Sequence, residues 1–247
     1  MFFSLDFGGY IVSFSAVFND TECYFRPYLK EKKDNSDSYM ISVDAQYMQD
    51  NRWLVSDDEQ SDAFLEYQCL MLATGNHLLS VSRALFHGVA FIWHDLAWIM
   101  TAPSGTGKTT QYRLWRRLWR KEIQIINGDK PLLECRNDDT VCVHSSPWMG
   151  KENLGRPGLQ AKLGGIILLE QGDHNEIRRM NSGEAVIPLW LEFVSEPENT
   201  EQILYQADVL DRILNTVPVW KLINIGDEDS AILTRNALSE YLEEKNE

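Results

Sequence analysis

The segment that most constrains the fold is residues 102–110, APSGTGKTT, which follow the apolar run 96–101. Gly105 and Gly107 permit main-chain conformations that other residues avoid, so this segment can turn sharply and direct N–H groups toward one point. The pattern of residues 108–121 predicts a helix, and a helix N-terminus attracts anions. A strand, a glycine-rich turn and a helix in this order are typical of a phosphate-binding loop, or P-loop. The sequence therefore predicts an α/β protein that binds a nucleotide.

The residue types of this loop suit a nucleotide that carries a magnesium ion. Lys108 would reach the β- and γ-phosphates, and the Thr109 hydroxyl would coordinate Mg²⁺. The loop pattern usually begins with glycine, whereas this chain has Ala102, which is also small. The predicted phosphate-binding residues are Ser104, Gly105, Thr106, Gly107, Lys108, Thr109 and Thr110.

An acidic partner for the metal ion follows the next predicted strand, residues 122–127. Asp129 comes directly after this strand, where it could hold Mg²⁺ or take the proton from an attacking hydroxyl. A plain turn aspartate is the alternative interpretation. Lys130 either pairs with phosphate or faces solvent. Thr109 and Asp129 are thus the predicted metal ligands.

The strand before the loop is predicted to belong to a β-hairpin. Two apolar runs, 87–93 and 96–101, are separated by His94 and Asp95, a weaker turn signal than Asn-Gly. The two strands would pair antiparallel, whereas the strand before the loop of common NTPases lies in a parallel sheet. The sequence therefore indicates a mixed sheet and a different class of P-loop enzyme.

Together these features resemble the P-loop kinases of the HPr kinase/phosphorylase and phosphoenolpyruvate carboxykinase type. The pair His87-Gly88 precedes the loop by one hairpin, and residues 104–110 are similar to the carboxykinase form of the loop. Gly128-Asp129 follows a strand at the place where this family has an acidic pair. The resemblance covers about residues 62–225. Residues 146–152 are also similar to small stand-alone relatives, some of which phosphorylate a serine of a ribosomal peptide.

The resemblance implies an α/β fold with a mixed-sheet P-loop core, and it implies ATP and Mg²⁺ as cofactors. It makes Asp129 the catalytic residue that activates the acceptor hydroxyl, and it places His87 near the phosphates. A structural role for His87 is the alternative. Lys130 stands where the family has its second acidic residue, so a second metal ion and the reverse phosphorylase reaction are not carried over. The family's signature sequence is also missing from residues 154–166, so HPr is not carried over as the substrate.

Residues 145–156, SSPWMGKENLGR, are predicted to form a loop that closes over the phosphates. Lys151 or Arg156 would then neutralise charge in the transition state, which makes Lys151 a predicted catalytic residue. An exposed connector anchored by Trp148 is the alternative.

The rest of the chain predicts two regions. Residues 1–60 read as short strands with turns between them, including the polar run 30–38, and form a small β-rich N-terminal region. Residues 61–247 form the kinase core, which begins with a helical stretch broken near Gly75 and ends with a helix, a strand and a helix. The arginines of residues 113–120 are expected to form a solvated helix face, with the leucines and tryptophans between them in the core.

Composition excludes several classes of partner. The chain of 247 residues has a net charge of −14, which disfavours binding to nucleic acid or to anionic membranes. It contains no apolar run long enough to span a bilayer, and Asp6 interrupts the apolar start, so no membrane partner and no signal peptide are predicted. Four cysteines without metal-site spacing indicate reduced thiols and a cytoplasmic protein. A homo-oligomer is left open.

The predicted function is an ATP- and Mg²⁺-dependent kinase that transfers the γ-phosphoryl group to a hydroxyl, with a serine of a peptide or protein as the preferred acceptor. The predicted catalytic residues are His87, Lys108, Asp129 and Lys151. One alternative is a kinase of a small molecule such as free serine. Another is a nucleotide-binding regulatory protein without turnover.

Overall fold

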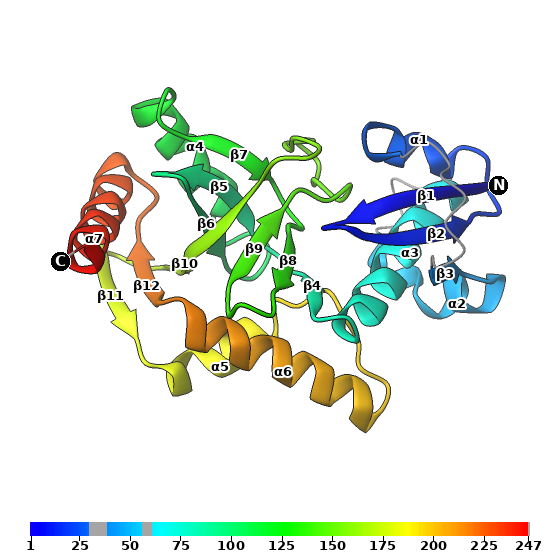
Figure 1. The fold of residues 1–247 in the computed structure, drawn as a ribbon. Helices are drawn as coiled ribbons and strands as arrows, with labels where there is room; N and C mark the ends of the chain where they lie inside the picture. Colours follow the sequence, from blue (N-terminus) through cyan, green and yellow to red (C-terminus); the bar gives the residue numbers. More distant parts are fainter. Residues whose placement is uncertain (30–38, 56–60, 247) are drawn as a thin grey trace.

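The computed structural model describes residues 1–29, 39–55 and 61–246, and the turn predicted at 30–38 lies outside them. The described part of the chain begins with a small three-stranded sheet (Figure 1). β1 (Phe2–Phe7) and β2 (Tyr10–Ser15) form an antiparallel hairpin, and β3 (Tyr39–Ser42) pairs parallel to β2. The hairpin turns at Gly8 and Gly9, whose φ angles of +65° and +85° favour glycine. The strands predicted at the start of the chain are therefore present, together with short helices that were not predicted.

A long helix packs against this small sheet. α3 (Asp62–Leu79) is continuous, so the break predicted near Gly75 is wrong. Glycine stands at this position because a Cβ would overlap the carbonyl oxygen of Val194, which lies directly against the helix. Side chains of α3 and of the small sheet share one buried apolar cluster. The short helices of this part are α1 (Thr21–Phe25), η1 (Arg26–Tyr28), α2 (Ala45–Asp50) and η2 (Arg52–Leu54). The division of the chain at residue 60 stays a prediction.

Within the described residues, the larger sheet has nine strands and is mixed. Its long strand β10 (Gln160–Gln171) runs parallel to β6 (Leu96–Thr101) and to β12 (Val219–Asn224). The first residues of β10 pair antiparallel with β9 (Val141–His144). The other strands are β4 (Arg83–Leu85), β5 (Val89–Trp93), β7 (Gln124–Asn127), β8 (Leu132–Cys135) and β11 (Glu176–Met180). The predicted α/β class with a mixed sheet is confirmed.

The hairpin predicted before the glycine-rich loop is present. β5 and β6 pair antiparallel, with Trp93 opposite Leu96. The turn residues His94 and Asp95 have φ angles of +50° and +58°. Two consecutive left-handed residues are what a type I′ turn requires, so the turn forms although neither residue is glycine.

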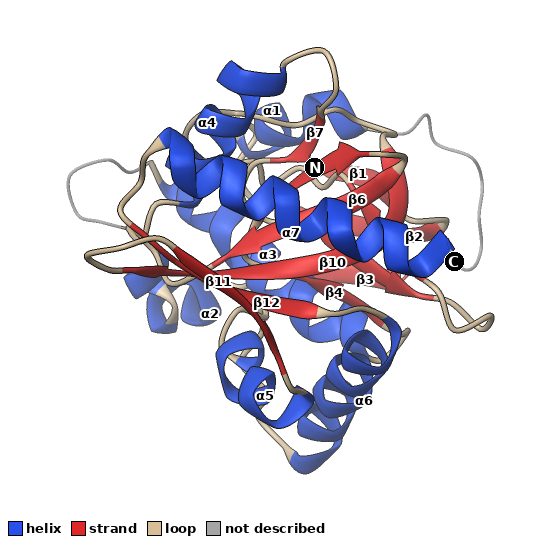
Figure 2. Ribbon diagram, turned by 90° about the vertical axis from the view of Figure 1, so that its left-hand side faces the viewer, coloured by secondary structure: helices blue, strands red, loops and turns tan. Residues whose placement is uncertain are grey.

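Helices cover both faces of the large sheet (Figures 1 and 2). On β6, Trp98 and Met100 face the cluster that contains side chains of α4 (Lys108–Trp119) and α7 (Glu228–Asn246). Ala97 and Ile99 face the opposite cluster, which contains side chains of α5 (Ser182–Trp190) and α6 (Thr200–Thr216). Figure 2 shows α7 crossing one face, with α5 and α6 below the sheet. β6 is thus buried on both sides, which fixes the start of the loop that follows it.

The helix after the loop has the two faces that the sequence predicts. Leu114 and Trp115 are buried in the cluster beneath α4. The side chains of Arg113 and Arg117 are 65% and 61% exposed and pair with Glu152 and Glu228, so this arginine face is solvated. Among the described residues, no helix is both long and apolar enough to cross a membrane. All four cysteines are free thiols, and three of them are buried.

Candidate active site

The glycine-rich loop connects β6 to α4, at the buried end of the strand. Gly105 and Gly107 have φ angles of +83° and +108°, and Gly107 is the N-cap of α4. These left-handed values are ones that residues with a Cβ rarely adopt, which explains glycine at both positions. Ala102 is fully buried in the cluster beneath α4. Its methyl group therefore contributes to the core, which accounts for alanine at the first position of the loop.

Lys108 is held against its own loop. Its Nζ donates to the carbonyl oxygen of Ala102 at 2.6 Å and to that of Pro103 at 3.3 Å, and the residue is 8% exposed. Burial lowers the pKa of Lys108, and of the charged groups that act on it, Glu192 opposes this change most strongly while Lys130 adds to it. Charges from two other parts of the chain, the turn of Asp129 and Lys130 and the segment of Glu192, thus act on the ammonium group.

The turn that carries Asp129 is organised by a buried asparagine. Asn127, the last residue of β7, is fully buried, and its Oδ1 accepts the main-chain N–H groups of Asp129 and Lys130, both at 2.8 Å. Its Nδ2 donates to the carbonyl oxygen of Ser146 at 2.9 Å. Gly128 has no room for a side chain, because a Cβ would lie 2.8 Å from that of Leu154. The main chain of the turn that carries Asp129 is therefore held by the Asn127 side chain and by close packing at Gly128.

His87 lies between two carboxyl groups. Its Nε2 is 3.5 Å from Asp129 Oδ1, and its Nδ1 is 2.8 Å from Glu192 Oε2. The Glu192 side chain is 5% exposed, whereas that of Asp129 is 32% exposed. Main-chain hydrogen bonds hold the same three segments together, from His87 N to Glu192 O at 2.7 Å and from Gly88 N to Asp129 O at 2.8 Å. The imidazole ring therefore bridges a buried acid and an accessible one.

Lys130 is the second lysine of this site. Its Nζ lies 3.2 Å from Asp129 Oδ1, and its side chain is 15% exposed. The sequence left phosphate and solvent as equal alternatives for Lys130. Because the side chain is mostly buried and paired with Asp129, the solvent-facing alternative is wrong.

Residues 145–156 lie against the Asp129 turn. Trp148 is 2% exposed, stacks on Phe7 at a ring distance of 6.0 Å, and donates from its indole nitrogen to Tyr67 O at 3.3 Å. A Cβ on Gly150 would lie 2.9 Å from the Cβ of Asp129, so this segment contacts the turn directly. The segment is thus anchored by Trp148, as one of the two interpretations expects. Lys151 and Arg156 are exposed, and their contact with phosphate stays a prediction.

The predicted metal ligands suit magnesium in their donor chemistry. Thr109 lies in the first turn of α4 and is half-buried, so its hydroxyl belongs to the start of the helix that the glycine-rich loop opens. Asp129 supplies a carboxylate. Hydroxyl and carboxylate oxygens are the ligands that Mg²⁺ prefers.

A second polar cluster lies where the β1–β2 turn meets the large sheet. Glu134 pairs with Arg83 at 2.8 Å, with Arg136 at 2.9 Å and with His144 at 3.0 Å. Glu134, Cys142 and His144 could together ligate a metal ion, but two arginines already neutralise the carboxylate. Arg83 also donates to the carbonyl oxygens of Phe7 and Gly8. This network therefore fastens the hairpin to the core.

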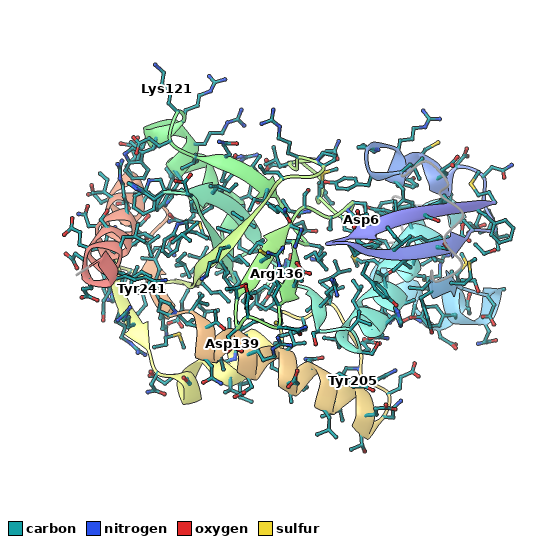
Figure 3. The ribbon with its side chains drawn as sticks, viewed as in Figure 1. Asp6, Lys121, Arg136, Asp139, Tyr205 and Tyr241 are labelled. Carbon is teal, nitrogen blue, oxygen red and sulfur yellow. The ribbon has the colours of Figure 1, made fainter. Side chains whose placement is uncertain are left out.

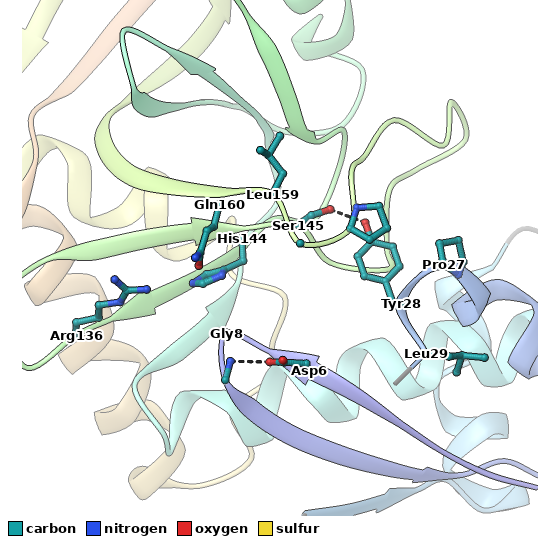
Figure 4. A pocket seen from close by; sticks show the side chains of 13 residues that line it. Asp6, Gly8, Pro27, Tyr28, Leu29, Arg136, His144, Ser145, Leu159 and Gln160 are labelled. Atoms are coloured by element: carbon teal, nitrogen blue, oxygen red, sulfur yellow. Dashed lines mark hydrogen bonds between the residues drawn. The ribbon is translucent and has the colours of Figure 1, made fainter. Parts of the chain in front are cut away.

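Beside this cluster is a cavity of about 580 Å³ (Figure 4). Figure 4 shows Arg136, His144 and Gln160 on one wall and the β1–β2 turn with Asp6 on another. Tyr28, which also lines the cavity, bonds to Ser145 Oγ and to the sulfur of Met149. Ser145 therefore lines the cavity, while the carbonyl oxygens of the nearby Ser146 and Trp148 accept hydrogen bonds from Asn127 and Lys130 of the Asp129 turn.

Of the predicted site residues, His87 and Asp129 are brought into contact, and the charge of Asp129 acts on Lys108. Ser104 and Thr110 are exposed. Sequence reasoning missed Asn127 and Glu192. A polar residue at the end of an otherwise apolar strand was a signal for Asn127. Glu192 had no local signal, because it reaches His87 only through the fold.

No protein-family model matches the sequence, and no curated protein is significantly similar to it. Among solved structures, the HPr(Ser) kinase/phosphatase from Coxiella burnetii is similar, with 11% sequence identity and a TM-score of 0.37. The match covers 64% of this chain and 97% of that chain. At this level the likeness of fold is distant and carries no argument about activity, so the function rests on the site itself.

Proposed function

We propose that this protein is an ATP- and Mg²⁺-dependent kinase that transfers the γ-phosphoryl group to a hydroxyl. The observation that carries the proposal is the meeting of Asp129 with His87 in a site whose charges act on Lys108 of the glycine-rich loop. A phosphate-binding lysine and an accessible carboxylate are the groups that phosphoryl transfer to a hydroxyl needs.

The chain's own residues divide the reaction between them. The amide groups of residues 104–108 and Lys108 bind the phosphates of ATP. Asp129 takes the proton of the acceptor hydroxyl, whose oxygen forms the new bond to the γ-phosphorus. The bond from that phosphorus to the β–γ bridging oxygen breaks, and ADP leaves with its electron pair. A Mg²⁺ ion held by Thr109 and Asp129 would neutralise the charge of the phosphates.

The preferred acceptor is a serine of a peptide or protein, as the resemblance of residues 146–152 implies. The net charge of −14 favours an acceptor peptide of opposite charge. A kinase of free serine is the second candidate, and a regulatory protein that binds nucleotide without turnover is the third.

Radiolabelled γ-phosphate transfer from ATP separates these candidates. The purified protein is incubated with free serine, with basic serine-containing peptides, and with any short peptide encoded beside its gene. We expect transfer to a peptide, lost in Asp129→Asn with nucleotide affinity retained, and loss of ATP affinity in Lys108→Ala. Transfer to free serine alone would select the second candidate, and nucleotide binding without transfer would select the third. Unchanged ATP affinity in Lys108→Ala would refute the assignment of the site.

A further inference from the structure

Lys130 has a rigidly held main chain. Its N–H donates to Trp148 O at 3.1 Å as well as to Asn127 Oδ1, and its carbonyl oxygen accepts from the Ser146 hydroxyl. Two of these partners belong to the segment that Trp148 anchors. The direction in which the lysine leaves the turn is therefore fixed, and only its side chain is left to move.

The turn that carries Lys130 is bonded to the segment that leads into the glycine-rich loop. Gly88 N donates to Asp129 O at 2.8 Å, and the hydroxyl of Thr101, the last residue of β6, donates to His87 O at 2.7 Å. Glu192 is bonded to His87, and Asp129 is the one carboxylate in contact with Lys130 among the described residues. An anion with several charges, bound between the loop and this turn, would be stabilised by both lysines.

Both lysines are held by protein groups that a phosphate can replace. Lys108 donates to two loop carbonyl oxygens, and Lys130 donates to Asp129. The Asp129 carboxylate that would take the acceptor's proton is thus occupied on Oδ1 by Lys130. A lysine that leaves Asp129 for a phosphate makes that oxygen available at the moment when nucleotide is bound.

We propose that Lys130 binds the γ-phosphate of ATP, leaving Asp129 as it does so. The inference rests on the kinase function proposed above and adds a second phosphate-binding cation to it. A lysine supplies a compact charge and three donors on a flexible stem, which suits a group that exchanges one oxygen ligand for another. Since ADP lacks the γ-phosphate, Lys130 distinguishes ATP from ADP, whereas Lys108 and the loop bind both.

The test is calorimetric binding of ATP and of ADP, each with Mg²⁺, to the full chain and to its Lys130→Met, Lys130→Gln and Lys130→Arg variants. Met and Gln keep most of the length of the side chain without its charge, so one of them can serve if the other does not fold. We expect each variant to weaken the binding of ATP by about tenfold or more and the binding of ADP by less than about threefold. Arg, which keeps the charge, should retain most of the preference for ATP.

Lys121→Met is the matched control, because Lys121 lies in the exposed turn after α4 and projects from the molecule (Figure 3). It should bind both nucleotides as the natural protein does. An equal loss of ATP and ADP affinity in both neutral Lys130 variants, or no loss in either, would overturn the inference while leaving the kinase proposal intact. A natural protein that binds neither nucleotide would overturn both.

Discussion

Gly105 and Gly107 show how single residues determine the glycine-rich loop. An added Cβ at either position would meet no atom within 4 Å, so crowding is not the reason for glycine. The reason is the left-handed main chain, which costs other residues about 1–2 kcal/mol. We expect Gly107→Ala to lower ATP affinity about tenfold, measured by calorimetry, because the N–H groups of the loop turn away from the phosphates.

Gly9→Ala is the matched control for this substitution. Gly9 also has a positive φ, +85°, and open space around it, but it lies in the β1–β2 turn. It should cost stability and leave nucleotide affinity unchanged. If the two variants changed ATP affinity equally, the loop geometry would not be what matters.

Glu192 is in direct contact with the site at His87, whose Nδ1 lies 2.8 Å from its carboxylate. We expect Glu192→Gln, which keeps the size and removes the charge, to lower kcat about tenfold, a change of about 1.4 kcal/mol, with the KM for ATP unchanged. In a chain that already carries His87→Ala, the same substitution should have no further effect on kcat, because its partner is gone. Additive losses in the double variant would show that Glu192 acts independently of His87.

At the scale of elements, Trp148 links residues 145–156 to the N-terminal sheet. Its ring lies against Phe7 and Phe25, at 6.0 Å and 5.7 Å between ring centres. Trp148→Ala should lower the free energy of unfolding by about 3–5 kcal/mol, measured by urea denaturation, because it empties a fully enclosed position. Trp53→Ala, at a side chain that is 62% exposed, should change it by less than about 0.5 kcal/mol. A similar loss in both variants would contradict the anchoring role.

The elements near the loop could be predicted because their signals are local. The hairpin, the loop and α4 follow one another along the chain, and each has its own pattern. α5 was missed although Asn181 and Glu184 form a capping box at its start, since the helix is short and contains Pro188. The helix break at Gly75 was wrong because the glycine serves a contact with Val194, which no local pattern reveals.

In the candidate site too, some residues have a local sequence signal and others are brought in only by the fold. Lys108 and Asp129 follow β6 and β7, whose last residues lie on either side of the start of β5, so the order of the motifs along the chain was enough to expect both at one edge of the sheet. Glu192 lies after α5, and its nearness to His87 follows from the order of strands in the sheet rather than from the sequence around it. The role proposed for Lys130 also depends on the burial of its side chain, which the sequence Asp129-Lys130 does not reveal.

At the scale of the whole molecule, the cluster around Glu134 links stability to pH. Burial lowers the pKa of His144, partly opposed by its hydrogen bond to Glu134. Burial alone would raise the pKa of Glu134, but hydrogen bonds from Arg136 and His144 outweigh it and the pKa is lowered. A histidine with a lowered pKa destabilises the fold once the unfolded chain binds its proton, and a carboxyl with a lowered pKa loses its contribution as pH falls.

The lowered pKa values of His144 and Glu134 therefore both make the folded state less stable as the pH falls. The thermal midpoint should fall as the pH is lowered below about 6.5, the ordinary value for histidine, and fall further near the ordinary value for glutamate. His144→Gln should flatten the first part of this decline in a series of melting curves. Burial also lowers the pKa of His77, so a smaller slope should remain in that variant. An unchanged slope would show that His144 does not contribute.

The contact between Gly75 and Val194 has a consequence for communication between distant parts of the protein. Val194 follows Glu192 by two residues and donates its main-chain N–H to Leu85 O at 2.9 Å, so the strip that carries the buried acid is wedged between α3 and β4. Gly75→Ala should push this strip and reduce phosphate transfer, although the substitution is made in a helix that contributes no predicted catalytic residue. Gly183→Ala, at an exposed position of α5 with only Asn181 Oδ1 nearby, should leave transfer unchanged. Because Gly75 has no side chain to separate α3 from Val194, we expect a displacement of α3 to move the Glu192 carboxylate that is bonded to His87.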